Sequence, residues 1–221
     1  MNDLNSRDRL TGALLLTSLV AMIAGAAIVV PSGLTLNPSA PDAALAAVGE
    51  RAGLHLTELA LDVLGWLTLT SAGLLMTTRR TETFRSYLVT LGGGLLACAG
   101  LAGLLHDAGN LALTQLASRP TAPAAATVAS AVMLTAKWGV NLAGLLWVAA
   151  TTATAVGVPL PSRLRVTGLI AALAGLAAVA LPWTTGGSSA ELEQLGYALH
   201  LPIMIWYGVL GRRYQTGIQL P

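Results

Sequence analysis

Two carboxyl groups and a histidine share one face of a strongly apolar segment. The spacing is three, four and four residues along the series His55, Glu58, Asp62 and Trp66. In an α-helix this spacing places all four side chains on the same face. A carboxylate at the centre of a membrane-spanning helix costs roughly 2.5–3.5 kcal/mol on insertion scales. Such residues are therefore expected to face a protein interior or a water-filled cavity.

Acid–base chemistry is the reaction type that this pair of carboxyl groups favours. A carboxylic acid in an apolar, dry site keeps its proton near neutral pH and can act as an acid. Glu58 and Asp62 are one helical turn apart, so we expect one to hold a proton while the other pairs with Lys137 or a histidine. The pattern suits an isomerase, a cyclase or a quinone-type enzyme that acts on a lipophilic small molecule.

The composition is that of a membrane protein. Of 221 residues, 54% are hydrophobic and 10% are charged, whereas about a quarter are charged in a typical soluble domain. Six apolar stretches approach the roughly 20 residues that span a bilayer. The sequence therefore predicts an all-α integral membrane bundle of six transmembrane helices, which forms a single domain over residues 1–221. The six spans are predicted near residues 11–30, 56–77, 87–105, 136–157, 166–183 and 195–211.

The charge pattern predicts the topology and excludes one class of partner. A net charge of +2, with scattered arginines, argues against a nucleic-acid surface. Nine of the twelve basic residues fall on the side of the N-terminus, which by the positive-inside rule places both termini in the cytoplasm and the chain in the inner membrane. These nine are Arg7, Arg9, Arg79, Arg80, Arg85, Arg163, Arg165, Arg212 and Arg213; the other three are Arg51, Arg119 and Lys137.

Several polar residues are predicted at one depth near the outer side. At about 1.5 Å per residue, Glu58, Asp62, Asn141 and His200 lie within roughly 10 Å of the outer ends of their helices. Three tryptophans come out deeper, at about 15 Å, and would form a floor: Trp66, Trp147 and Trp206. The residues from Asp107 to about Thr135 are expected to form an outer loop, with a short interfacial helix over 110–117.

These depths define an outward-facing pocket of acidic and histidine side chains. We expect the catalytic residues to be Glu58, Asp62 and His200. The ligand-binding residues would be His55, His106, Asn141, Lys137, Tyr197, Trp66, Trp147 and Trp206.

Plainer explanations remain open for several of these residues. Lys137, beside Trp138, is typical of a lysine that extends to the membrane surface, and a buried pair with Lys137 would account for Asp62. The alternative to an enzyme is a non-catalytic membrane subunit, or a small transporter or ion-binding protein. The expected partners are membrane lipid and a lipophilic small molecule.

The sequence requires no cofactor. No HExxH-type run fixes a metal geometry, so no metal ligand is assigned. Haem held by His106 and His200 is conceivable, and neither haem nor metal is excluded. The single cysteine, Cys98, allows no intramolecular disulfide.

Two short runs, Arg9–Leu16 and Leu201–Gly211, together with the carboxylate-bearing second segment, resemble an uncharacterised family of small bacterial six-span membrane proteins. The resemblance implies a six-helix fold and an inner-membrane location, and it carries no residue roles. In general character the chain is also similar to integral-membrane terpene cyclases, which are small helical bundles with carboxylates at membrane level. Its single phenylalanine and aromatic content of 5% depart from that group.

Overall fold

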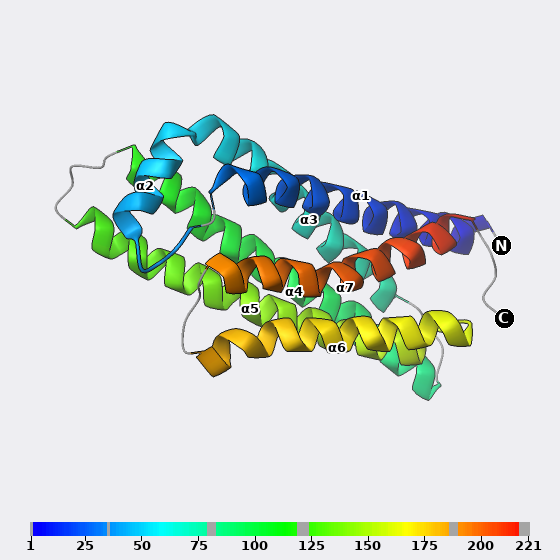
Figure 1. The fold of residues 1–221 in the computed structure, drawn as a ribbon. Helices are drawn as coiled ribbons and strands as arrows, with labels where there is room; N and C mark the ends of the chain where they lie inside the picture. Colours follow the sequence, from blue (N-terminus) through cyan, green and yellow to red (C-terminus); the bar gives the residue numbers. More distant parts are fainter. Residues whose placement is uncertain (1, 35, 79–82, 119–123, 186–189, 217–221) are drawn as a thin grey trace.

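The computed structural model describes residues 2–34, 36–78, 83–118, 124–185 and 190–216. Within these ranges the chain is entirely helical, with seven helices and no strand. Figure 1 shows their arrangement as an elongated bundle. The helices are α1 (Asn2–Ser32), α2 (Pro41–Glu50), α3 (Ala52–Thr77), α4 (Phe84–Ala117), α5 (Ala125–Gly157), α6 (Ser162–Thr185) and α7 (Ala190–Thr216).

The six long helices pack side by side in a closed ring. Each contacts the next in chain order, from α1 through α3, α4, α5 and α6 to α7, and α7 returns to α1. Both termini lie at the same end of the bundle, and the short α2 lies at the opposite end (Figure 1). Large side chains from several helices fill the middle of the ring, among them Met22, Trp66, Trp147 and Tyr207.

Five of the helices are long and apolar enough to cross a membrane: α1, α3, α4, α5 and α6. This is the composition of a multi-pass membrane protein. The predicted span at 195–211 lies within α7, which is not one of the five. The first half of α7 carries Tyr197, His200 and Pro202, which lower its mean hydropathy.

The predicted outer loop from Asp107 to Thr135 is wrong, because most of this segment is helical. α4 continues to Ala117, so residues 110–117 are its last turns and not a separate interfacial helix, and α5 already begins at Ala125. The extension is stabilised by a second apolar cluster, in which α2 covers the ends of α4 and α5. Its buried members are Leu36, Ala44, Leu45, Val48, Leu113, Ala117, Ala125, Ala129 and Met133.

Small residues allow α3 and α4 to approach closely, as is common between membrane helices. A Cβ atom added at Gly73 of α3 would collide with the backbone of Gly93 and Ala97 on α4. Further along the contact, a Cβ at Gly100 would meet the backbone of Trp66. The tight α3–α4 contact therefore fixes which side chains of the two helices lie opposite each other further along.

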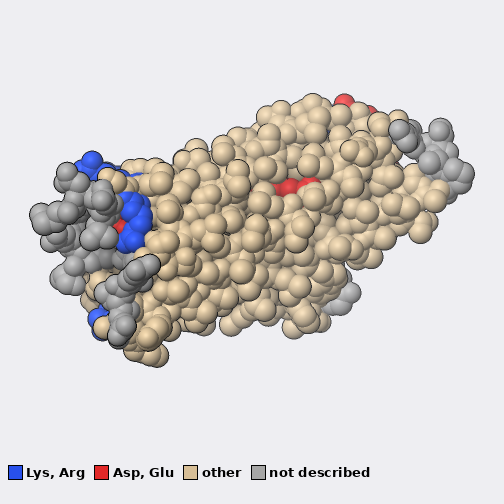
Figure 2. All heavy atoms as spheres, turned by 180° about the vertical axis from the view of Figure 1, so that it is seen from behind, with Lys and Arg blue, Asp and Glu red and all other residues tan. Residues whose placement is uncertain are grey.

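Basic residues gather at one end of the molecule, as Figure 2 shows from behind. The ends of the six long helices that adjoin the two termini carry Arg7, Arg9, Arg85, Arg163, Arg165, Arg212 and Arg213. Arg79, Arg80 and Arg119 lie outside the described residues. The separation of charge along the bundle is the one expected from the sequence.

Candidate functional site

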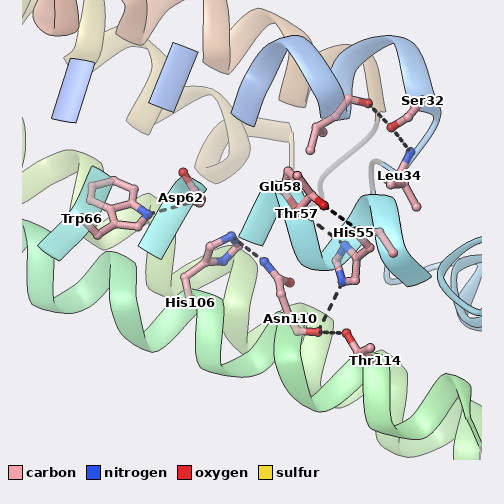
Figure 3. Close-up of polar contacts among 12 residues, drawn as sticks. Ser32, Leu34, His55, Thr57, Glu58, Asp62, Trp66, His106, Asn110 and Thr114 are labelled. Carbon is pink, nitrogen blue, oxygen red and sulfur yellow. Dashed lines mark hydrogen bonds and ion pairs between the residues drawn. The ribbon is translucent and has the colours of Figure 1, made fainter. Parts of the chain in front are cut away.

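The candidate site lies where the polar face of α3 meets α4. The two helices run antiparallel, so their side chains meet in reverse order. His55 lies opposite Asn110, Asp62 lies opposite Asp107, and Trp66 lies against Gly103. Figure 3 shows His55 reaching toward Asn110 on α4. The face predicted from the spacing of α3 is thus the face that meets its neighbour.

Asp107 is the most deeply buried charged residue of the site. Its side chain is 0% exposed, and neither of its carboxyl oxygens accepts a hydrogen bond from an N–H or O–H group in the described chain. The carboxyl group of Asp62 faces it across the helix contact. Two carboxylates in an apolar interior repel each other, so this pair requires a proton or a cation between its members.

His106 lies beside this carboxyl pair with a defined arrangement of hydrogen bonds. Its Nδ1 is 2.9 Å from the carbonyl oxygen of Ala136 on α5, and its Nε2 is 3.0 Å from the side-chain nitrogen of Asn110. A carbonyl can only accept, so Nδ1 carries the proton and donates it. Nε2 then has a free lone pair, to which the Asn110 amide donates (Figure 3).

His55 and Glu58 form a second polar pair, closer to the N-terminal end of α3. The distance from His55 Nδ1 to Glu58 Oε2 is 3.7 Å, and His55 Nε2 lies 3.5 Å from the Asn110 carbonyl. The side chain of Glu58 is 12% exposed, and Asp62 is partly buried. Figure 2 shows a small group of acidic atoms in the middle of one long face, and further acidic atoms at the upper edge toward the end opposite the basic residues.

Aromatic rings lie next to the carboxyl groups, beginning with Trp66, one helical turn C-terminal to Asp62 on α3. The indole N–H of Trp66 donates to Asp62 Oδ2 at 3.3 Å, and the ring stands edge-on to Trp147, with centroids 5.7 Å apart. Trp206 is turned toward α6, where its indole N–H donates to the Leu164 carbonyl at 2.8 Å. In the described chain it contacts Tyr207 and neither of the other two tryptophans. Of the three tryptophans predicted to form a floor, Trp66 and Trp147 are therefore the two whose rings contact each other.

Two other predicted residues lie away from the carboxyl groups. Asn141 faces α6, where its amide donates to the Val179 carbonyl at 3.0 Å and accepts from the indole of Trp183 at 2.8 Å. His200 stacks on Trp147, with centroids 6.5 Å apart, and its Nδ1 donates to the Gly196 carbonyl. Neither side chain belongs to the carboxyl cluster.

Lys137 and Tyr197 lie close enough to the cluster to interact with it electrostatically. Lys137 of α5 interacts with His106. Tyr197 of α7 interacts with the carboxyl groups of Glu58, Asp62 and Asp107. As a residue, Tyr197 is 43% exposed.

The interior contains a cavity of about 10 Å³, which is room for about one water molecule. Its lining is mainly apolar and includes none of the carboxyl groups: Leu15, Ser18, Leu19, Met22, Leu69, Trp147, Met204 and Tyr207. The cavity is therefore separate from the polar cluster. A molecule that reaches the carboxyl groups would do so from their exposed side.

Asp107 and Asn110 were not selected from the sequence. The signal that identifies them is the series Gly100, Gly103, Asp107, Asn110 and Thr114, whose steps of three and four residues describe one helix face. The two glycines at its start indicate a close helix contact, so the residues that follow on this face are directed at the same neighbour. Because the third span was predicted to end near residue 105, the residues after it were not placed on the same helix face.

Comparison with protein-family models, curated proteins and solved structures gives no significant match for this chain. Its functional interpretation therefore depends on the geometry of the site.

Proposed function

We propose that this chain is a six-span inner-membrane protein, with both termini in the cytoplasm, that carries out acid–base chemistry on a lipophilic small molecule. Two features support the topology. α7 closes the ring between α1 and α6, so a membrane around the other five helices also surrounds α7. The basic residues lie at the end of the bundle that holds the termini, which is the cytoplasmic end under the positive-inside rule.

The pairing of Asp62 with Asp107 supports acid–base chemistry. Two facing carboxyl groups in a medium of low dielectric cannot both stay ionised, so they share a proton that can be given up and regained. The pair thus holds an acid and a base at one point. The observation that carries the proposal is this burial of facing carboxyl groups within an apolar helix contact.

Glu58 and His55 extend the proton path toward the outer end of α3. His55 Nε2 points at the Asn110 carbonyl, so its Nδ1 is left to exchange a proton with the Glu58 carboxyl group 3.7 Å away. Glu58 also retains some contact with the surroundings. In this proposal Glu58 exchanges protons with the outside, and the Asp62–Asp107 pair carries out the reaction.

The substrate class follows from the surface around the acids. Glu58 and Asp62 lie partly exposed on α3, whose other exposed side chains are mainly leucines such as Leu64 and Leu67, so the molecule that reaches them comes from the bilayer. Trp66, which is buried against α4 and donates to Asp62, can stabilise positive charge on a molecule held at Asp62. Tyr197 brings a hydroxyl group close enough to interact with the three carboxyl groups. His200 is not part of this centre, because it lies against Trp147.

Deuterium transfer tests this function although the substrate is unidentified. Membranes that contain the wild-type protein are incubated in D₂O, and extracted lipophilic molecules are compared by mass spectrometry with those from Asp62→Asn membranes. Asp42→Asn, an exposed position on α2, is the matched control. We expect at least one small molecule to gain deuterium with wild type and the control, but not with Asp62→Asn. Identical extracts from all three, at equal protein levels, would contradict the proposal.

An ion-binding protein is the second candidate. It is favoured by the ligand atoms that Asp62, His106 and Asp107 place close together.

A further inference from the structure

Three potential metal ligands converge at the α3–α4 contact. A carboxyl oxygen of Asp62, a ring nitrogen of His106 and a carboxyl oxygen of Asp107 all lie within 4.8 Å of one another. They come from two helices whose separation is fixed by glycine contacts. Two hard oxygens and one imidazole nitrogen form a ligand set suited to a divalent first-row transition metal.

A second observation points independently to a ligand at this place. Asp107 is 0% exposed, and apart from the Asp62 carboxyl group that faces it, its two carboxyl oxygens have no hydrogen-bond partner among the described residues. Buried polar groups are nearly always paired, because an unpaired one costs free energy. The side chain is directed at Asp62 and His106. A cation at their centre would supply the missing partner.

His106 already has the tautomer of a metal ligand. Metal-bound histidines commonly donate their other ring N–H to a carbonyl or a carboxylate, which fixes the orientation of the ring. Here Nδ1 donates to the Ala136 carbonyl, and the Nε2 lone pair is directed at the side-chain amide of Asn110 on α4 (Figure 3). The group that now occupies this lone pair is the side-chain amide of Asn110, which is a neutral donor and can turn away.

We propose that Asp62, His106 and Asp107 bind one divalent transition-metal ion of the zinc class. Metal–ligand bonds of about 2.0–2.2 Å in a tetrahedral site place the ligand atoms roughly 3.4 Å apart. The observed separations, up to 4.8 Å, close to this value by small side-chain rotations. Asp62 retains its bond from Trp66 on Oδ2 and binds the metal through its other oxygen. The fourth position stays open.

Charge balance supports a doubly charged ion. Two carboxylates and a neutral imidazole, together with a dication, have no net charge, which suits an apolar helix contact. Calcium is disfavoured, because it takes six to eight oxygen ligands. Lys137 disfavours a bound cation. It interacts with His106, and its positive charge lowers the affinity of the site for any cation.

This inference rests on the proposed function and deepens it. A metal at the open site lowers the pKa of a bound water molecule and thereby provides a base. Glu58 is not one of the three ligands, and it remains free to exchange protons beside the metal. The metal and the shared proton are thus alternative occupants of the space between Asp62 and Asp107.

Cobalt titration tests the metal site directly. The full chain is purified in detergent, treated with a chelator and titrated with Co²⁺, which absorbs visible light when it is bound by nitrogen and oxygen ligands in a four-coordinate site. We expect saturation at one Co²⁺ per chain and displacement by Zn²⁺. We expect Asp107→Asn and His106→Gln each to weaken binding at least about 10-fold, and Asp42→Asn to bind like wild type.

The outcomes separate this inference from the proposed function. Absence of a saturable Co²⁺ spectrum from wild type, or equal binding by His106→Gln, overturns the metal site. Circular dichroism and gel filtration establish that each variant is folded before it is compared. If the protein binds no Co²⁺ but still shows Asp62-dependent deuterium transfer, the metal site is overturned and the acid–base function stands. If the protein binds one Co²⁺ per chain but transfers no deuterium, the metal site stands and the acid–base function is overturned.

Discussion

The indole ring of Trp66 on α3 occupies the space that a side chain at Gly103 of α4 would take. This contact lies one helical turn away from the facing carboxyl groups of Asp62 and Asp107. It therefore sets the distance between the two helices at the candidate site. Changes at Gly103 act on the site without altering any of its polar groups.

Substitution of Gly103 by alanine should destabilise the protein and weaken the site. A methyl group there must displace the Trp66 ring, and overpacking of this kind costs about 1–3 kcal/mol. Gly94→Ala is the control, because a Cβ at Gly94 meets nothing within 4 Å and alanine favours the helix. We expect a lower apparent melting temperature for Gly103→Ala in detergent and an equal or higher one for Gly94→Ala. Equal melting temperatures for both variants would show that the contact does not constrain α3 and α4.

Asp107→Asn should weaken metal binding at least about 10-fold without destabilising the metal-free protein. An amide at this position removes the repulsion from Asp62 and can donate a hydrogen bond to it, so stability should stay the same or rise by up to about 2 kcal/mol. Thermal unfolding of chelator-treated wild type and variant measures the effect. A large loss of stability would instead mean that Asp107 is retained for packing.

Lys137→Met should strengthen cation binding. Removal of a positive charge near His106 makes the site more favourable for a dication, by roughly 1 kcal/mol for a dication and a unit charge about 8 Å apart under the screening of bulk water. This corresponds to an increase in Co²⁺ affinity of about five-fold. Methionine keeps most of the length and apolar character of the lysine side chain. Unchanged or weaker binding would indicate that the ion does not occupy the space beside His106.

Cysteine labelling tests the topology. In a Cys98→Ala background, single cysteines are placed at Asp42 on α2 and at Arg212 near the end of α7, both of which are exposed. A membrane-impermeant maleimide added to intact cells should label the first position only. Permeabilised cells should allow both to react, which verifies that each cysteine is accessible. Labelling of Arg212→Cys in intact cells would reverse the proposed orientation.

The chemistry-bearing face of α3 could be predicted from spacing alone. His55, Asp62 and Trp66 all meet α4 in the structure, because the cost of a carboxylate in hydrocarbon turns that face toward a neighbouring helix. The long apolar helices could be predicted from composition, because a helix needs roughly 20 mainly apolar residues to span a bilayer. These features are local, and helical periodicity is sufficient to find them.

The partners of this face could not be found by the same reasoning. Hydropathy ends a predicted span near the first charged residue, yet α4 continues past Asp107 because α2 and α5 cover its last turns. Counting residues along a helix tells how far along it a side chain lies, but it does not tell which neighbouring helix that side chain faces. Asn141 and His200 face α6 and Trp147 instead of the carboxyl groups. The order of helices in the ring decides these contacts.

Infrared difference spectroscopy of the Asp62–Asp107 pair is the most direct measurement of the central claim. A protonated carboxyl group in an apolar site has a C=O stretching band that is distinct from that of a carboxylate and shifts in D₂O. Chelator-treated wild type at neutral pH should show this band, and Asp107→Asn should lack it. Absence of the band from wild type, or the same band in the variant, would contradict a proton held between these two residues.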